Sequence, residues 1–319
     1  MQTRKLGSSG LSVSEIALGS WLTFGSSVDT TASQQLVHAA YDLGVNFFDT
    51  ADVYATGAAE EALGSALRDL PRPYVVIATK CFFPMSERPN DRGLSRKHIM
   101  ESIEGSLRRL GTDYIDLHQC HRADPETPIE ETVRAYEDAI RQGKILYWGV
   151  SEWSAEAIER ACQVADQTGG YRPISNQPNY SILRREIETE VLPTCIARGI
   201  GQVAFSPLGQ GALTGKYSGG ARPEDSRAMD EARNRWMRAY LDEDVLGKVD
   251  TLRPLADRLE MSMAQLALTW CLNRTGVCSA IIGVTKREQL EDNCKAPIRE
   301  LPEDILSAID AIFPPPTKA

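Results

Sequence analysis

The chain has 319 residues, and because 42% of them are hydrophobic it can build a large core. Its formal net charge of −9 at pH 7 argues against a surface that binds nucleic acid or an anionic membrane. Its N-terminus lacks the apolar region of a secretory signal, and no stretch approaches the ~18 apolar residues that span a bilayer. The seven cysteines include no C-x-x-C pair, so we expect a cytoplasmic protein with reduced thiols and no membrane insertion.

Short runs rich in β-branched and aromatic residues alternate with helical patterns along the chain. The predicted strands are Glu15–Leu18, Asn46–Asp49, Tyr74–Thr79, Tyr114–His118, Ile145–Gly149, Ile174–Gln177, Gln202–Phe205 and Ser279–Ile282. The helices expected between and after them are 31–43, 58–69, 95–110, 128–142, 154–168, 184–198, 239–259 and 286–293. Such alternation is typical of parallel strands joined by crossover helices, with about 30 residues in each βα unit. The sequence therefore predicts an α/β fold, a (β/α)₈ TIM barrel.

Three segments fall outside this eightfold rhythm. Residues 2–14 contain Ser8-Ser9-Gly10 between short apolar runs, which predicts an N-terminal β-hairpin covering the bottom of the barrel. Residues 207–238 form a long loop after the seventh strand, and loops of such length are usually functional. A last helix is expected over 302–312, on the outside. No linker interrupts the pattern, so we expect one domain over residues 1–319.

Four chemically useful side chains follow three neighbouring strands. Asp49 ends the second predicted strand, Tyr54 lies on the loop that leaves it, Lys80 ends the third, and His121 lies just past the fourth. In an eight-stranded barrel the reactive groups lie at the C-terminal ends of the strands, so we expect these four at one rim.

These residue types suit the reduction of a carbonyl group. Tyr54 would protonate the oxygen as negative charge develops on it. A nearby Lys80 would stabilise the phenolate by about 4 kcal/mol at ~4 Å, which lowers the pKa of the tyrosine by up to roughly three units before desolvation is subtracted. Asp49 would hold Lys80 charged, and His121 would orient the carbonyl oxygen.

Each of these residues has a plainer interpretation when taken alone. Asp49 could be a turn residue, Tyr54 a packing residue, Lys80 a solvated strand end and His121 a structural histidine; their joint placement favours chemistry. A metal site at His118 and His121 is rejected, because residues three apart in a strand point to opposite faces, and no Cys/His cluster occurs.

A glycine-rich segment with a lysine, Gly209-Gln-Gly211-Ala-Leu-Thr-Gly215-Lys216, follows the seventh strand. It is not the dinucleotide fingerprint, because its third glycine is one residue too far. Barrels often bind phosphate at this position, while a flexible surface loop is an equally good interpretation of these residues alone.

The chain resembles the aldo-keto reductases along nearly its whole length. Within them it looks most like the β subunits of voltage-gated potassium channels and their bacterial relatives. The segments that carry the resemblance include FFDTADVYATGAAEEALG, ILYWGVSEWS, SPLGQGALTGKY and IIGVTKREQLEDN.

The resemblance implies the barrel fold, a tetrad of Asp49, Tyr54, Lys80 and His121, and binding of NADP(H). It implies nicotinamide contacts from Ser20, Trp21, Asp49, Ser151, Glu152 and Gln177, with Phe205 stacked on the ring. The pyrophosphate contacts that it implies come from Ser206, Pro207, Leu208, Gly209, Gln210, Gly211 and Lys216. Those to the adenosine end come from Arg227, Gly283, Thr285, Lys286, Gln289, Asp292 and Asn293.

Four positions depart from the family pattern. Relatives usually carry Asn or Arg at position 152, Trp or Tyr at 205 and Glu at 292, where this chain has Glu152, Phe205 and Asp292. Position 121 is histidine, where mammalian channel β subunits carry asparagine. This last difference favours ordinary carbonyl turnover.

We therefore expect a reductase that transfers hydride from NADPH to small aldehydes or ketones. The preference for NADPH over NADH would come from cations at the 2′-phosphate, Arg227 and Lys286, with Arg287 as a second candidate next to Lys286. The alternative is a channel-associated subunit that uses NADP(H) as a redox sensor. His121 and the lack of an extension ahead of the barrel argue against it. The substrate and the oligomeric state stay open; a homo-oligomer is compatible with the resemblance.

Overall fold

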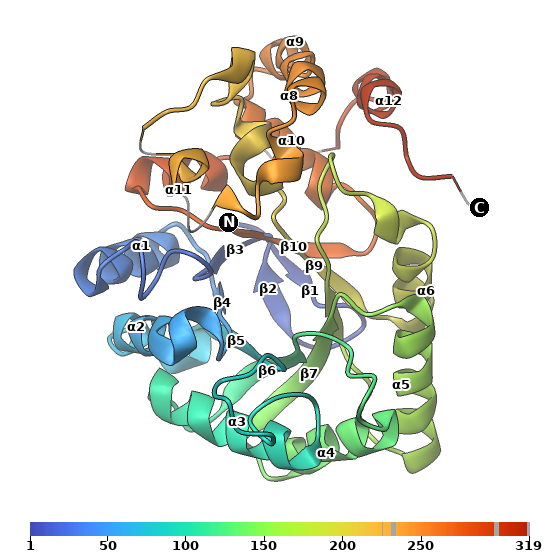
Figure 1. The fold of residues 1–319 in the computed structure, drawn as a ribbon. Coiled ribbons are helices and arrows are strands. Elements are labelled where there is room, and N and C mark those ends of the chain that lie inside the picture. Colours follow the sequence, from blue (N-terminus) through green and yellow to red (C-terminus); the bar gives the residue numbers. More distant parts are fainter. Residues whose placement is uncertain (225, 231–233, 297–299, 318–319) are drawn as a thin grey trace.

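Eight parallel strands close into a barrel in the part of the chain that the computed structural model describes, which is residues 1–224, 226–230, 234–296 and 300–317 (Figure 1). Their order around the barrel is β10-β3-β4-β5-β6-β7-β8-β9. The strands are β3 (Ile16–Gly19), β4 (Phe47–Asp49), β5 (Val76–Cys81), β6 (Ile115–Cys120), β7 (Ile145–Ser151), β8 (Ser175–Gln177), β9 (Gly201–Phe205) and β10 (Val277–Ile282). The predicted barrel is confirmed; that the whole chain forms one domain stays a prediction.

Helices surround this barrel, and those that follow β9 gather beside β10 and β3 (Figure 1). They are α1 (Thr30–Asp42), α2 (Ala58–Leu67), α3 (Arg96–Leu110), α4 (Ile129–Arg141), α5 (Ala155–Thr168), α6 (Val191–Arg198), α8 (Glu243–Asp250), α9 (Arg253–Arg258), α10 (Met263–Leu272), α11 (Arg287–Cys294) and α12 (Glu303–Ile312). No helix within the described ranges is both long and apolar enough to cross a membrane.

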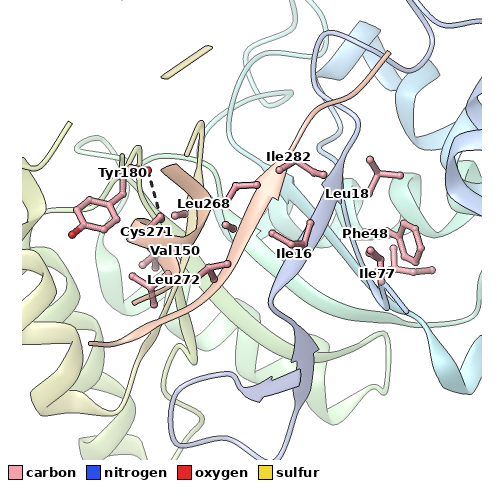
Figure 2. Close-up of a cluster of buried hydrophobic side chains, with 14 of the residues drawn as sticks. Ile16, Leu18, Phe48, Ile77, Val150, Tyr180, Leu268, Cys271, Leu272 and Ile282 are labelled. Atoms are coloured by element: carbon pink, nitrogen blue, oxygen red, sulfur yellow. Dashed lines mark hydrogen bonds between the residues drawn. The ribbon is translucent and has the colours of Figure 1, made fainter. Parts of the chain in front are cut away.

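Alternating side chains along the strands build two separate apolar layers. Because successive residues of a strand point to opposite faces, neighbours such as Phe47 and Phe48 belong to different clusters. The outer layer, between strands and helices, is drawn in Figure 2 and includes Ile16, Leu18, Phe48, Ile77 and Ile282. The inner layer includes Ala17, Phe47, Val76, Ala78 and Ile281. Asp49 and Lys80 continue the inner series by the same alternation, so both point into the barrel.

The N-terminal hairpin closes one end of the barrel interior. Strands β1 (Thr3–Lys5) and β2 (Ser12–Ser14) pair antiparallel, as predicted. Leu6 and Val13 of the hairpin are fully buried in the inner layer against strand residues such as Leu117. The hairpin thus seals the end of the barrel opposite the C-terminal ends of the strands.

Two predicted helices differ from the structure. The expected helix 184–198 is a short 3₁₀ turn, η3 (Glu186–Glu188), followed by α6, which starts only at Val191. The expected helix 239–259 is divided into α8 and α9, because Pro254 in the first turn of α9 has no amide hydrogen to continue the ladder.

Helix α10 was not predicted at all. Nearly all of its residues are buried, so it shows no polar stripe and its sequence MAQLALTWCL lacks the helical period. Leu268 and Leu272 of this helix pack in the outer layer (Figure 2). The available signal was the capping box of Ser262 and Gln265, which satisfies amides at the helix start.

The predicted long loop after β9 consists largely of short 3₁₀ turns. Part of it, residues 225 and 231–233, lies outside the described residues. The turns along it are η4 (Gly209–Thr214), η5 (Ser218–Gly220), η6 (Arg227–Met229) and η7 (Arg238–Tyr240), and elsewhere the chain forms η1 (Tyr54–Gly57) and η2 (Arg72–Tyr74). The last helix, α12, lies where it was expected and buries Ile305 and Ile309.

Candidate active site

A buried ion pair lies at the C-terminal end of the barrel interior. Lys80 of β5 has no exposed surface, and its Nζ donates to Asp49 Oδ1 at 2.6 Å and to the Thr50 carbonyl at 2.7 Å. Asp49 ends the neighbouring strand β4. Since a buried charge is costly unless it is paired, this contact fixes both side chains at the rim.

Gln177 completes the surroundings of that carboxylate. Its side-chain Nε2 donates to Asp49 Oδ2 at 2.8 Å, and its backbone carbonyl accepts from Ser151 Oγ at 2.8 Å. Gln177 and Ser151 end β8 and β7. The structure therefore joins two of the predicted nicotinamide contacts to the ion pair, a link that the sequence did not indicate.

Tyr54 and His121 stand next to this ion pair. Tyr54 starts η1, and its ring centroid lies 5.2 Å from Lys80 Nζ and 5.6 Å from the centroid of the His121 ring, edge to face. His121 follows β6 directly, and its Nδ1 is buried without a hydrogen-bond partner in the described structure. The four predicted tetrad residues thus come together at one rim.

The electrostatic setting of Tyr54 differs from the expectation. Burial, and then the charge of Asp49, raises the pKa of Tyr54 well above 10. The ammonium of Lys80 donates hydrogen bonds to the Asp49 carboxylate and to the Thr50 carbonyl. Burial lowers the pKa of Lys80 itself. The phenol is therefore held in its protonated form, because the desolvation that the expected effect of Lys80 left aside raises the pKa.

His121 is held neutral. Burial, and then the charges of Lys80 and Arg122, lowers its pKa well below 6.5. A neutral imidazole carries one N–H, so it can donate one hydrogen bond without bringing a positive charge.

His118 lies apart from His121, in the layer between strands and helices. Its Nδ1 lies 3.0 Å from the Tyr136 hydroxyl of α4, and burial lowers its pKa to about 3. The two histidines therefore face different partners, as the strand alternation indicates. Across the described residues no group of three or more His, Cys, Asp or Glu side chains is arranged to hold a metal ion.

The predicted pyrophosphate loop and Arg227 are linked to each other. Gln210 Nε2 donates to Ser206 Oγ at 2.6 Å, and Arg227 Nη1 donates to Gln210 Oε1. Ser206 and Gln210 adopt φ of 54° and 56°, so this segment turns sharply as it leaves β9. Gly209, Gln210 and Gly211 begin η4, Pro207 and Leu208 precede it, and Lys216 is exposed after it.

The predicted adenosine contacts after β10 divide into two groups. Exposed Thr285 donates its amide to Gln289 Oε1 at 3.0 Å, near exposed Gly283 and Lys286. Asp292 instead accepts from Ser262 Oγ at 2.9 Å and from Gln265 Nε2 at 2.9 Å, so its carboxylate is bonded to the start of α10. The remaining side chains are placed as follows: Asn293 is buried, and Arg287 pairs with Glu291 on the surface of α11.

The remaining predicted nicotinamide contacts surround the rim from several strands. Glu152 has φ 56°, and its carboxylate accepts a hydrogen bond from the backbone amide of Asn179 at 2.6 Å. Ser20 is buried and donates to Thr50 Oγ1 at 2.8 Å, while the half-buried Phe205 ends β9. Asn179 Oδ1 is a buried acceptor without a partner in the described structure, and sequence reasoning missed it.

Three further side chains, Trp236, Phe83 and Arg122, lie at the site. Trp236, on the long loop, lies 5.8 Å from Trp21, and Trp21 lies 6.5 Å from Tyr54, measured between ring centroids. Phe83 lies 4.9 Å from His121, and Arg122 Cζ lies 5.5 Å from the Phe83 ring. Lone residues in irregular loops show no period, so only the fold brings them together.

Asp52 is a buried acid behind the tetrad. Its Oδ2 accepts from Ser102 Oγ at 2.9 Å, whereas Oδ1 has no partner in the described structure. Burial, and then the charge of Glu60, raises the pKa of Asp52 from 3.8 to about 7. A carboxyl whose pKa is higher in the folded state stabilises the protein at low pH, and that stability is lost as the pH rises toward 7.

Asp52→Asn should therefore remove part of the pH dependence of stability. Between pH 5 and pH 8 the wild type should lose about 3 kcal/mol of unfolding free energy relative to the variant. Urea unfolding at both pH values measures this, with exposed Asp113→Asn as the matched control. Parallel curves for the wild type and Asp52→Asn would contradict it.

Comparison with known proteins gives a consistent family assignment. Residues 15–313 match the family model described as "Aldo/keto reductase family". The chain is 46% identical over 318 residues to a "Probable voltage-gated potassium channel subunit beta" of Oryza sativa, covering 98% of this chain and 96% of that protein. It is 48% identical over 300 residues to a protein of the same name from Arabidopsis thaliana, covering 93% and 91%. A "Putative voltage-gated potassium channel subunit beta" of Schizosaccharomyces pombe is 41% identical over 319 residues, covering 97% and 92%.

Proposed function

Because the chain belongs to the aldo/keto reductase family, we propose that it reduces aldehydes or ketones to alcohols with NADPH, and that Tyr54 is the proton donor. The observation that carries the proposal is the meeting of Tyr54, His121 and the buried pair of Lys80 and Asp49 at the ends of three neighbouring strands. A protonated phenol, a neutral imidazole and a buried cation are the groups that carbonyl reduction needs.

Each residue then has a defined task. When bound, NADPH supplies the hydride that the carbonyl carbon accepts. The ring N–H of His121 would donate a hydrogen bond to the carbonyl oxygen, and the Tyr54 hydroxyl would transfer its proton to that oxygen. The resulting phenolate faces Lys80, whose ammonium is held in place by Asp49. Water re-protonates Tyr54 after the alcohol leaves.

The residues around the rim fit a dinucleotide. The buried and unpartnered Asn179 Oδ1 could accept from a carboxamide NH₂, and Ser151 and Gln177 lie on the adjoining strand ends. Arg227 and Gln210 form a polar pair over the loop after β9, where phosphate oxygens could replace their mutual bond. Phe205, at the end of β9, would stack on the nicotinamide ring.

Loss of NADPH absorbance with a panel of small aldehydes tests the activity. We expect turnover with at least one aromatic or aliphatic aldehyde, at a rate that depends on protein concentration. Calorimetric titration with NADPH provides the independent measure of cofactor binding. Binding of NADPH without turnover on any carbonyl compound of the panel would contradict the proposed reaction.

NADPH should bind more tightly than NADH. The two cofactors differ by a 2′-phosphate, and charge-assisted hydrogen bonds contribute ~1.5–3 kcal/mol each. Loss of one contact should therefore weaken NADPH binding about tenfold to a hundredfold, and Arg227→Ala with Lys286→Ala should weaken it by roughly 10²–10⁴-fold if both contacts form. NADH binding should change little. Dissociation constants from fluorescence titration measure this, with Arg287→Ala as a control, because Arg287 is paired with Glu291. Equal weakening of both cofactors would refute the assignment.

The names of the three relatives favour a second candidate, a subunit that binds a potassium channel. Under this hypothesis the cofactor acts as a redox sensor. Co-purification with the cytoplasmic domain of a channel from the same organism would support it. The absence of any complex at micromolar concentrations of both proteins would contradict it.

A further inference from the structure

Aromatic rings from three loops lie near Tyr54 and His121: Trp21 contacts Tyr54, Phe83 contacts His121, and Trp236 contacts Trp21. Trp21 follows β3, Phe83 follows β5 and Trp236 lies on the loop after β9, so the rings approach from different sides of the rim. Trp236 is 48% exposed although it contacts Trp21. Flat apolar walls of this kind favour a planar aromatic group next to the proton donor.

Arg122 places a cation beside these rings. Its Nη1 donates to the His121 carbonyl at 2.5 Å, and its Cζ lies 5.5 Å from the centroid of Phe83, which itself contacts His121. Among the described residues no carboxylate lies within ion-pair distance of Arg122. The nearby acid Asp124 is instead bonded to the Leu94 amide at 2.7 Å and to Thr127 Oγ1 at 2.8 Å.

Arg122 is not among the residues that are expected to bind the phosphates of the cofactor. They follow β9 and β10, whereas Arg122 follows β6, which lies across the barrel from β10 in the strand order. A half-buried guanidinium whose donors are not all used is a ready partner for a carboxylate, because its planar fork matches two oxygens.

We infer that the substrates are aromatic aldehydes or ketones that carry a carboxylate remote from the carbonyl carbon, with the ring between Trp21, Trp236 and Phe83 and the carboxylate on Arg122. This inference rests on the proposed reductase function. The carbonyl group would lie at Tyr54 and His121, and the anionic group at the Arg122 guanidinium.

The test compares 4-carboxybenzaldehyde with 4-methylbenzaldehyde, a neutral compound of similar shape. Arg122→Met should lower the ratio of their kcat/KM values roughly tenfold, because one charge-assisted contact is lost. The comparison between variants cancels the different intrinsic reactivity of the two aldehydes. Arg122→Lys, which keeps the charge, should restore part of the ratio. Arg141→Met makes the same charge change on an exposed residue at the far end of α4 and should leave the ratio unaltered.

A second variant tests the aromatic wall. Trp236→Ala should lower kcat/KM for 4-methylbenzaldehyde more than for butanal, since only the aromatic substrate loses a ring contact. An unchanged aldehyde ratio in Arg122→Met, with circular dichroism showing a folded protein, would overturn the inference.

A measurement of product binding distinguishes failure of this inference from failure of the proposed reaction. Calorimetry with 4-(hydroxymethyl)benzoate, the product, in the presence of NADP⁺ should give roughly tenfold weaker binding to Arg122→Met than to the wild type. This readout needs no turnover. Absence of turnover on every aldehyde would refute the reductase, while equal affinities of the two proteins for the product would refute the carboxylate contact.

Discussion

Replacing Tyr54 with phenylalanine should lower kcat for aldehyde reduction by about 10²–10⁴-fold, because a positioned general acid contributes a factor of that size. The ring of Phe would keep the packing of the Tyr54 ring, which lies 5.6 Å from His121 and 6.5 Å from Trp21 between centroids. The change therefore removes the transferable proton and little else. NADPH absorbance under saturating aldehyde measures the effect.

The matched control is Tyr74→Phe. Tyr74 is 67% exposed and precedes β5, at the opposite end of that strand from Lys80, so its hydroxyl has no access to the site. This control should keep the wild-type rate, and both variants should bind NADPH with wild-type affinity. If Tyr54→Phe retained full turnover, another group would have to supply the proton.

Lys80→Met should destabilise the protein by about 3–5 kcal/mol, because it leaves Asp49 as a buried and unpaired carboxylate. The methionine matches the length of the lysine stem, so little packing is lost. Urea unfolding at pH 7 measures the change. Turnover should be lost as well, since no cation then faces the Tyr54 phenolate.

Two comparisons separate the electrostatic cause from simple loss of a side chain. Asp49→Asn combined with Lys80→Met should be more stable than Lys80→Met alone, because the unpaired charge is gone. Lys97→Met removes a lysine from an exposed pair with Glu101 and should change stability little. If the double variant were less stable than Lys80→Met, the pair would not be the source of the cost.

The alternation of strands and helices along the sequence was sufficient to predict the barrel, the hairpin and the rim. Each depends on local periodicity or on turn residues such as Ser8-Ser9-Gly10, which a single sequence shows. The same pattern predicted that Asp49, Lys80 and His121 follow neighbouring strands, and the structure brings them together with Tyr54. The roles assigned to these residues stay predictions.

Hydrophobic periodicity did not predict a helix that is buried on nearly all sides, and it predicted one helix where a proline separates two. Helix α10 is buried on almost every side, so it carries no polar stripe, and α8 and α9 separate at Pro254 within what reads as one helical run. Pro254 and the capping box of Ser262 are local signals for these ends, but the helical period alone does not show them.

The partners of the site residues were decided by tertiary structure alone. Only the closed barrel places Gln177 on the second oxygen of Asp49, and Trp236 beside Trp21. It also determines how strongly burial raises the pKa of Tyr54, an effect that the sequence-based expectation for Lys80 did not include. The reason is physical: desolvation and long-range contacts depend on the positions of residues far apart in the chain, and these positions exist only after the barrel has closed.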